Sequence, residues 1–464
     1  MISTNNTIPE SPQHELPREL GLVTATAVVV ASMIGTGIFT TTGLILAELP
    51  SPATVMLCWV VGGLFALSGA LCYAELGAMF PQAGGEYVYL RESLGRLAAF
   101  LSGWISLIVG FSAPIAASAI AFATYALSIF GPGTSANATP LSPVIGLNPI
   151  SHTAILSVGI ILLLSLLHHR GLKVGTRVQN WLTAFKVLLL VGMCGAGLAL
   201  GRGDVAHLHG SLHEQGIFSH AFAVSLIFIS FAYSGWNAAT YLGAEIRQPA
   251  RNLPRALIGG TVLVIIIYLL VNYLYLYAVP ADLMAGTINV GVMAAKALFG
   301  ETSGRIVSAG IAVCILSAIS AMILTGPRVY YAMARDGLFF RSFARLSPGS
   351  NTPGWSIFLQ AFLAIIMVLT ATFDNLLIYI GFTLSLFASL TVIGMVVLRI
   401  KYPALPRPYR TWGYPIAPLF FIVGNLWIIF VSVQSRPVAS LFGLVTIAVG
   451  ILVYLYIVRK SRLK

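Results

Sequence analysis

The chain has 464 residues, of which 58% are apolar and only 9% are charged, and its mean hydropathy is +0.90. A soluble domain carries about 25% charged residues, so this composition excludes a soluble enzyme, a disordered protein and a disulfide scaffold. A net charge of +12 on a soluble protein would suggest a nucleic-acid partner, but here the basic residues lie between long apolar runs. We therefore expect a polytopic membrane protein that contacts lipid and binds no nucleic acid.

Apolar runs long enough to cross a bilayer follow one another along almost the whole chain. They cover about 20–47, 53–79, 93–130, 151–168, 176–200, 217–245, 254–278, 303–333, 355–372, 375–399, 414–434 and 437–458. The sequence thus predicts an all-α membrane protein with 12 transmembrane helices between a tail at 1–19 and a tail at 459–464. The mixed segment 279–302 is predicted to be an outer loop with an interfacial helix.

The distribution of basic residues predicts the orientation of these spans. With twelve spans both termini share one side, and most of the 26 Lys and Arg residues fall on that side. Cytoplasmic loops carry such an excess, so we expect both termini in the cytoplasm of a multi-pass protein of the inner or plasma membrane. Residues 1–19 lack the charged segment and short apolar core of a cleavable signal peptide.

The cysteines and histidines give no sign of a metal or cofactor. Four cysteines lie inside apolar runs without a CxxC pair and are expected to be core residues: Cys58, Cys72, Cys194 and Cys314. Four histidines in one predicted outer loop could ligate zinc or copper, although a plain polar loop fits them better: His207, His209, His213 and His220. No catalytic grouping occurs in the spans, so we expect no enzyme activity, no metal and no cofactor.

Two spans contain glycine interruptions at corresponding depths. Residues 31–39 of the first span read Ala-Ser-Met-Ile-Gly-Thr-Gly-Ile-Phe, and residues 231–237 of the sixth read Phe-Ala-Tyr-Ser-Gly-Trp-Asn. An offset of five spans reverses the direction of crossing, which predicts two inverted halves at 20–200 and 217–399 followed by two added spans at 414–458. Paired interruptions of this kind are typical of the binding site of a transporter.

The chemistry of these interruptions favours a zwitterion. Gly35 and Gly37 permit backbone shapes that release N–H and C=O groups from the helical hydrogen bonds, and a polar ligand can satisfy these groups. The helix end after the break suits a carboxylate, and carbonyls before it suit an ammonium. Alternatively, the glycines only allow helices to pack closely. A lysine within the fifth span, Lys186, favours the site, because an intramembrane charge is costly; the other interpretation is a lysine that snorkels to the surface.

Several motifs resemble those of the amino acid–polyamine–organocation (APC) superfamily, and its L-type amino acid transporter branch most of all. They include Gly-Ala-Leu-Cys-Tyr-Ala-Glu-Leu-Gly at 69–77, Pro-Gln-Ala-Gly-Gly-Glu-Tyr-Val-Tyr at 81–89 and the sixth-span sequence already quoted. Further matches are Arg-Val-Gln-Asn at 177–180, Asn272 with Tyr275, and Arg328 with Arg-Asp-Gly at 335–337. The resemblance runs from about residue 18 to 435 and implies a LeuT-type 5+5 inverted repeat, with helices 1 and 6 unwound, that works by alternating access.

The resemblance also implies roles for individual residues. It places the substrate on the first break at Met33, Gly35, Thr36, Gly37 and Ile38 and on the second at Phe231, Ala232, Ser234 and Asn237. Backbone N–H groups of Thr36, Gly37 and Ile38 would hold the carboxylate, and carbonyls of Met33, Phe231 and Ser234 would hold the ammonium. Phe231 would be the aromatic gate, Tyr275 would support the first helix, and Lys186 would occupy the place of a sodium ion. On an apolar helix, however, Phe231 is also compatible with a core position, and Tyr275 with an interfacial belt.

The expected function is sodium-independent transport of small to medium neutral L-amino acids, by exchange or import. Ser234 stands where the branch that carries large neutral substrates has Gly, and loop 131–150 contains no Cys to join a heavy-chain glycoprotein, so that partner is not expected. A proton-coupled importer of cationic amino acids remains the alternative, although no carboxylate is evident in the predicted pocket. A channel or a nutrient-sensing receptor on the same scaffold is a third possibility, but no filter sequence or long soluble tail supports it.

Overall fold

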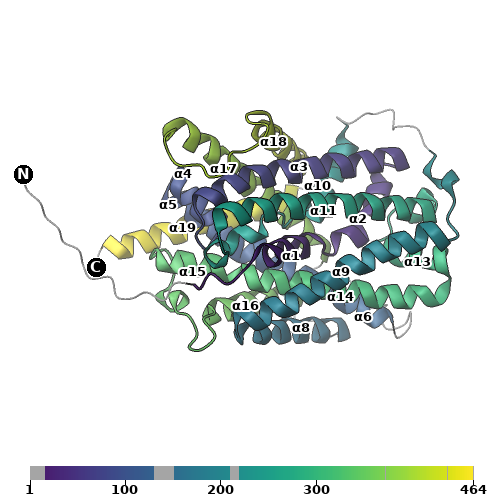
Figure 1. Cartoon of the computed structure of the whole chain (residues 1–464), viewed down its shortest axis with the longest axis horizontal. Coiled ribbons are helices and arrows are strands. Elements are labelled where there is room, and N and C mark those ends of the chain that lie inside the picture. Colours follow the sequence, from purple (N-terminus) through teal and green to yellow (C-terminus); the bar gives the residue numbers. More distant parts are fainter. Residues whose placement is uncertain (1–15, 130–150, 210–218, 371–372, 436, 463–464) are drawn as a thin grey trace, which may run out of the picture.

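Long apolar helices run along the longest axis of the molecule in the computed structural model shown in Figure 1. The structure describes residues 16–129, 151–209, 219–370, 373–435 and 437–462. Within these ranges ten helical segments are long and apolar enough to cross a membrane. They are 22–48, 52–79, 96–127, 152–169, 172–200, 249–278, 301–335, 383–401, 416–435 and 440–459. The predicted all-helical, multi-spanning organisation is therefore confirmed.

Several of these segments consist of more than one helix. The first half of the chain contains α1 (Leu22–Met33), α2 (Gly37–Glu48), α3 (Pro52–Met79), α4 (Glu86–Leu94), α5 (Arg96–Ile105), the π-helix η1 (Ser106–Ser112), α6 (Ala113–Ser128), α8 (His152–His169), α9 (Leu172–Leu200) and η2 (Val205–Leu208). The second half contains α10 (His220–Ala232), η3 (Ala238–Tyr241), η4 (Gly243–Glu245), α11 (Pro249–Ala278), α12 (Ala281–Met284), α13 (Val290–Phe299), α14 (Glu301–Thr325), α15 (Pro327–Arg335), η5 (Arg341–Ala344), α16 (Gly354–Thr370), α17 (Phe373–Lys401), α18 (Ile416–Ser435) and α19 (Pro437–Arg462).

The sixth predicted span is shorter than the sequence suggested, and the described part of the ninth ends at Thr370. The sixth was expected over about 217–245, but α10 ends at Ala232, where the interruption at 233–237 replaces the helix by turns and short 3-10 segments. The ninth is the 17-residue helix α16. Both are apolar helices below the length that crosses a bilayer without help from neighbouring segments.

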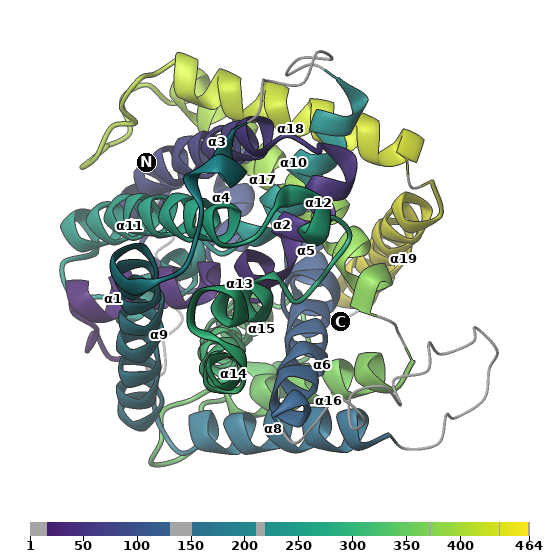
Figure 2. The same ribbon diagram turned by 90° about the vertical axis from the view of Figure 1, so that its right-hand side faces the viewer.

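The interrupted helices lie inside the bundle, and apolar surface faces outward. Seen along the long axis in Figure 2, α8, α16, α18 and α19 lie at the periphery, whereas α2 and α10 lie within. Only 11% of the apolar window of α19 is buried, compared with 61% of the window that includes α1 and α2. Outer helices with exposed apolar side chains match a lipid environment. α1 begins and α19 ends at the same end of the molecule, beside α4 and α15 (Figure 1).

Candidate functional site

The first interruption leaves backbone N–H groups free at the start of α2. α1 ends at Met33, and Gly35 donates its N–H to the Met33 carbonyl at 2.8 Å, which closes a tight turn. Among the residues that the structure describes, the N–H groups of Thr36, Gly37 and Ile38 make no hydrogen bond, and the buried Thr36 hydroxyl is also unpartnered. Free N–H groups at a helix start form a site for an anionic group.

The second interruption follows Ala232. Gly235 adopts a φ of +95°, in the left-handed region, and η3 resumes a helical path at Ala238. The backbone N–H and the hydroxyl of Ser234 both donate to the Phe231 carbonyl, at 3.0 and 2.7 Å. That carbonyl, which we expected to hold a substrate ammonium, therefore accepts two hydrogen bonds from the chain itself in this structure.

The two interruptions pack directly on each other. A Cβ atom on Gly37 would lie 2.5 Å from the Cα of Ala232, and one on Gly235 would lie 2.8 Å from Ser32. The glycines thus allow close packing between two parts of this chain. A side chain at position 37 would collide with Ala232, so this glycine is required for the packing of the two interruptions, whether or not its N–H also binds a substrate.

A tyrosine of α11 joins the carbonyls of both interruptions. The hydroxyl of Tyr268 lies 2.6 Å from the Met33 carbonyl oxygen and 3.0 Å from that of Ala232. The Tyr275 hydroxyl has no hydrogen-bond partner within the described part of the chain. Tyr268, which the sequence did not single out, therefore reaches both interruptions through its hydroxyl, and Tyr275 makes no such hydrogen bond.

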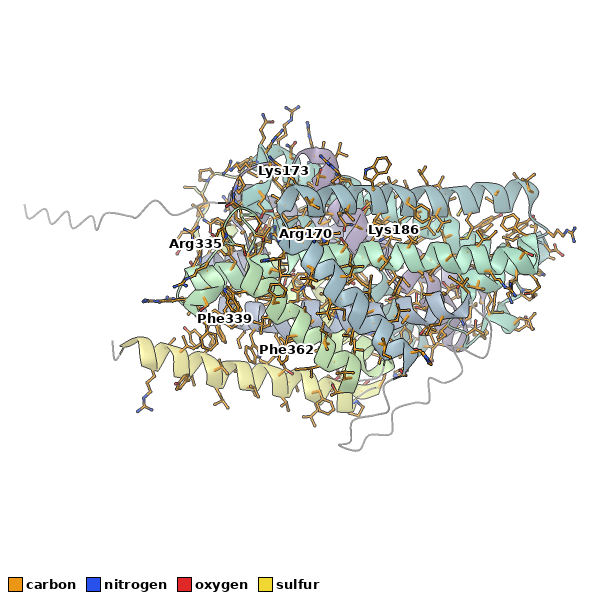
Figure 3. All side chains as sticks on the ribbon, turned by 90° about the horizontal axis from the view of Figure 1, so that it is seen from below. Arg170, Lys173, Lys186, Arg335, Phe339 and Phe362 are labelled. Atoms are coloured by element: carbon orange, nitrogen blue, oxygen red, sulfur yellow. The ribbon has the colours of Figure 1, made fainter. Side chains whose placement is uncertain are left out.

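Lys186 reaches the first interruption from α9. Its ammonium donates to the carbonyl oxygens of Ala31, at 3.0 Å, and Ile34, and its side chain is fully buried. These carbonyls are free to accept because the α1 hydrogen-bonding pattern ends there. In Figure 3 Lys186 lies well inside the bundle, whereas Arg170, Lys173 and Arg335 lie towards one end. The contact expected for Lys186 is present, and the lysine does not snorkel to the surface.

A cavity of about 130 Å³ lies beside the second interruption. Three of the residues predicted to bind substrate line it: Phe231, Ser234 and Asn237. From the region of the first interruption, Ser32 also lines it. The other predicted residues are absent from its wall: Met33, Gly35, Thr36, Gly37, Ile38 and Ala232. The π-helix η1 adds Ser106 and its neighbours to the lining, a contribution that hydropathy could not reveal.

A carboxyl group also lines this cavity, contrary to our expectation. Glu86, at the start of α4, accepts hydrogen bonds on Oε1 from the Tyr73 hydroxyl at 2.7 Å and from the Asn237 amide at 2.8 Å. Burial raises the pKa of Glu86 above its ordinary value. The residue belongs to the sequence Gly-Gly-Glu-Tyr, but nothing in that pattern indicates that it faces the sixth span.

Three ion pairs involve residues in or next to α4, α15 and α17. They join distant elements rather than sequence neighbours: Glu245 with Arg328 at 3.1 Å, Asp336 with Arg91, and Glu75 with Arg399 at 2.9 Å. The first pair is completely enclosed, since both side chains are at most 1% exposed. The Glu245–Arg328 pair ties the segment that follows the second interruption to α15.

The four cysteines are buried, as predicted. No group of three His, Cys, Asp or Glu side chains that could hold a metal ion occurs in the described ranges, and His213 lies outside them. His207 instead faces the Tyr277 carbonyl at 3.2 Å, and His220 faces the Ser435 hydroxyl at 2.9 Å.

A family model and the similar proteins of known name all point to one family. The model of the amino acid permease family matches residues 20–458. The serine/threonine exchanger SteT of Bacillus subtilis (strain 168) is 31% identical over 417 residues, 89% of this chain and 91% of that protein. Large neutral amino acids transporter small subunit 2 of Mus musculus is 31% identical over 444 residues (95% and 81%), and mouse b(0,+)-type amino acid transporter 1 is 30% identical over 439 residues (94% and 86%).

Proposed function

The chain belongs to the amino acid permease family of the APC superfamily, related to its L-type branch, and we propose that it is a sodium-independent transporter of small to medium neutral L-amino acids. The observation that carries this proposal is the contact of the Lys186 ammonium with the carbonyls of Ala31 and Ile34. A cation fixed there by a covalent tether performs the task that a bound metal ion would otherwise perform.

The proposed architecture is a LeuT-type 5+5 inverted repeat of 12 spans, with halves at 20–200 and 217–399 and added spans at 414–458. Its support is the corresponding position of the interruptions at 34–36 and 233–237 in the two halves. The excess of basic residues in the loops on the same side as the termini supports cytoplasmic termini in an inner or plasma membrane. Alternating access would move the segments after each interruption relative to α3, α11 and α14.

The substrate backbone is proposed to bind between the interruptions. The free N–H groups of Thr36, Gly37 and Ile38 would receive the carboxylate, next to the turn at Gly35. The carbonyls of Met33, Phe231 and Ser234 are the proposed ammonium acceptors. The Met33 and Phe231 oxygens already accept from the Tyr268 and Ser234 hydroxyls, so the ammonium would use the second lone pair of each oxygen or displace these hydroxyls. Phe231, half-buried on the cavity wall, is the proposed gate, with Ala232 behind it and Asn237 beside it.

The hydroxyl-bearing wall of the cavity favours a small substrate. Ser32, Ser106, Ser230, Ser234 and Ser385 line it. The name of the bacterial serine/threonine exchanger points in the same direction. Glu86 is the one observation that favours the second candidate, a proton-coupled importer of cationic amino acids, because a carboxylate could pair with a substrate cation.

The protein is proposed to act without a heavy-chain glycoprotein. The sequence of 131–150 contains no Cys for such a link, and this loop lies outside the described residues.

Uptake into proteoliposomes tests the proposal. The purified chain would be reconstituted with or without internal L-serine, in sodium or choline buffer, and uptake of radiolabelled L-serine would be competed with L-alanine, L-leucine, L-tryptophan and L-lysine. We expect equal uptake in both buffers and the strongest competition from small neutral amino acids. Stimulation by internal L-serine identifies exchange. Strict sodium dependence would refute the proposed role of Lys186, and dominant competition by L-lysine would favour the second candidate.

A Ser234→Gly variant in the same assay tests the size limit. Loss of the serine side chain frees space of about one methylene group, so the binding of L-tryptophan should improve by about 1–3 kcal/mol and its competition should strengthen. Ser234→Ala keeps Cβ and should not improve competition by L-tryptophan. Equal tryptophan competition in all three proteins would contradict the assignment of Ser234 to the size limit.

A further inference from the structure

Three carboxyl side chains are buried in the described part of the chain, and one of them differs from the other two. Glu75 lies 2.9 Å from the Arg399 guanidinium, and Glu245 lies 3.1 Å from Arg328. Glu86 is 6% exposed, yet no basic group of the described residues lies within the 4.0 Å of an ion pair. A buried carboxylate without a counter-charge is costly, and it is relieved by binding a cation or a proton.

Neutral groups surround Glu86. Oε1 accepts from Tyr73 of α3 and from Asn237, and the hydroxyls of Tyr89 of α4 and Tyr241 of η3 lie nearby. Tyrosine is uncharged near neutral pH, so these groups supply no counter-charge, and only the hydrogen bonds from Tyr73 and Asn237 oppose the effect of burial on the pKa of Glu86. Burial therefore dominates and raises the pKa of Glu86, which begins a helix outside the candidate spans.

The charged groups on the elements that pack against α4 are engaged elsewhere. On α4 itself Arg91 contacts Glu92 and Asp336. On α5, Arg96 donates to the Asp336 carbonyl. On α15, Arg328 pairs with Glu245, and Arg335 lies 5.9 Å above the Tyr331 ring. On α17, Arg399 pairs with Glu75, and Lys401 is exposed. None of them makes an ion pair with Glu86.

The access of water to Glu86 depends on the segment that follows the second interruption. It lines the cavity, and its bond to Asn237 joins α4 to the segment that follows Gly235. The preceding Gly84 donates its N–H to the Tyr241 carbonyl at 3.2 Å, so two contacts hold this segment over the carboxyl. Any movement of residues 237–241 away from α4 would admit water to Glu86.

We propose that Glu86 is a proton-binding site of the transport cycle, protonated while the 237–241 segment covers it and ionised when that segment opens and water receives its proton. This inference rests on the proposed transport function and adds proton coupling at a residue other than Lys186. A second source of positive charge, the cationic side chain of a substrate, is the competing occupant.

Infrared difference spectroscopy tests proton binding without any transport. The reconstituted protein would be titrated between acid and alkaline pH, and the carbonyl band of a protonated carboxyl followed. We expect a band that persists to higher pH than that of an exposed glutamate, that is absent in Glu86→Gln and that is retained in Glu301→Gln, whose side chain is 84% exposed. A spectrum of Glu86→Gln identical to that of the unmodified protein would overturn the proposal, even if transport is normal.

The coupling is tested with uptake of radiolabelled L-serine under an imposed pH gradient. Uptake by the unmodified protein and by Glu301→Gln should rise when the external pH is lowered, whereas uptake by Glu86→Gln should not respond. A gradient response that survives Glu86→Gln would overturn the proposal. An unchanged gradient response combined with lost competition by L-lysine would also overturn it and assign Glu86 to a cationic substrate.

Discussion

The ammonium of Lys186 and the carbonyl oxygen of Ala31 lie 3.0 Å apart, although 155 residues separate them in the sequence. The Ile34 carbonyl accepts a second hydrogen bond from the same ammonium. Both carbonyls belong to the last turn of α1 and the interruption that follows, so the lysine holds the end of a half-helix. A charged side chain thus fixes the end of α1 against α9, which also contacts α1 through the hydrogen bond from Asn180 to Thr24.

Lys186→Ala should reduce uptake by more than tenfold with normal expression, because each hydrogen bond to a charged group contributes about 1.5–3 kcal/mol. Lys173→Ala, on the same helix but 80% exposed, is the matched control and should transport normally. Uptake of L-serine by both variants, in sodium and in choline buffer, checks the prediction. Unimpaired uptake by Lys186→Ala would remove the structural basis for sodium independence.

The interruptions and the functional candidacy of Lys186 could be predicted from the sequence, because glycines inside long apolar runs and a lone intramembrane lysine are strong local signals. The choice between Tyr268 and Tyr275 could not. The two residues are two helical turns apart and share one face of α11, so periodicity gives both the same orientation. Only the packing of α11 against the interruptions decides which hydroxyl reaches a carbonyl.

The role of Glu86 was missed for a different reason. Its partners Tyr73 and Asn237 are 13 and 151 residues away, and the segment 81–86 carries no periodic pattern that orients a side chain. The same limit applies to the ion pairs. Glu245 pairs with Arg328, 83 residues away, and no local pattern in the sequence indicates that partner.

Phe231→Ala should impair transport strongly, because this side chain lines the cavity next to the second interruption. Phe228→Ala is the matched control: it lies one turn earlier on α10, is also half-buried and does not line the cavity. Phe421 is unsuitable as a control, since it lines the same cavity. Initial uptake rates of the two variants, normalised to the amount of folded protein, check the prediction. Equal losses would assign Phe231 to packing alone.

Arg328→Met should destabilise the protein by about 3–5 kcal/mol, because it leaves the enclosed Glu245 carboxylate without a counter-charge. The double variant Glu245→Gln/Arg328→Met should recover much of this loss. Lys296→Ala breaks the exposed pair with Glu301 and should change stability by less than about 1 kcal/mol. Thermal unfolding in detergent ranks the stabilities of the three variants. A double variant as unstable as Arg328→Met would contradict the importance of the counter-charge.

The stability of the unmodified protein should fall relative to Glu86→Gln as the pH rises. A raised pKa in the folded state means that the protonated carboxyl is favoured by folding. Its contribution is complete below the unfolded-state pKa of about 4.3 and is lost as the pH rises through the higher folded-state pKa. Melting temperatures of both proteins across this pH range check the sign. A melting temperature of the unmodified protein that rises relative to that of Glu86→Gln as the pH rises would contradict the raised pKa.

Tyr268→Phe and Tyr275→Phe make a matched pair on one helix. The first removes the single hydroxyl proton that the carbonyls of Met33 and Ala232 share, a hydrogen bond that contributes about 1 kcal/mol, so uptake should fall by a factor of roughly 5. The second removes a buried hydroxyl that has no partner within the described residues, and it should leave both uptake and melting temperature unchanged or slightly raised. Both substitutions keep the aromatic ring, so differences in packing are small. A larger loss in Tyr275→Phe than in Tyr268→Phe would mean that α11 supports the interruptions through a different contact from the one in this structure.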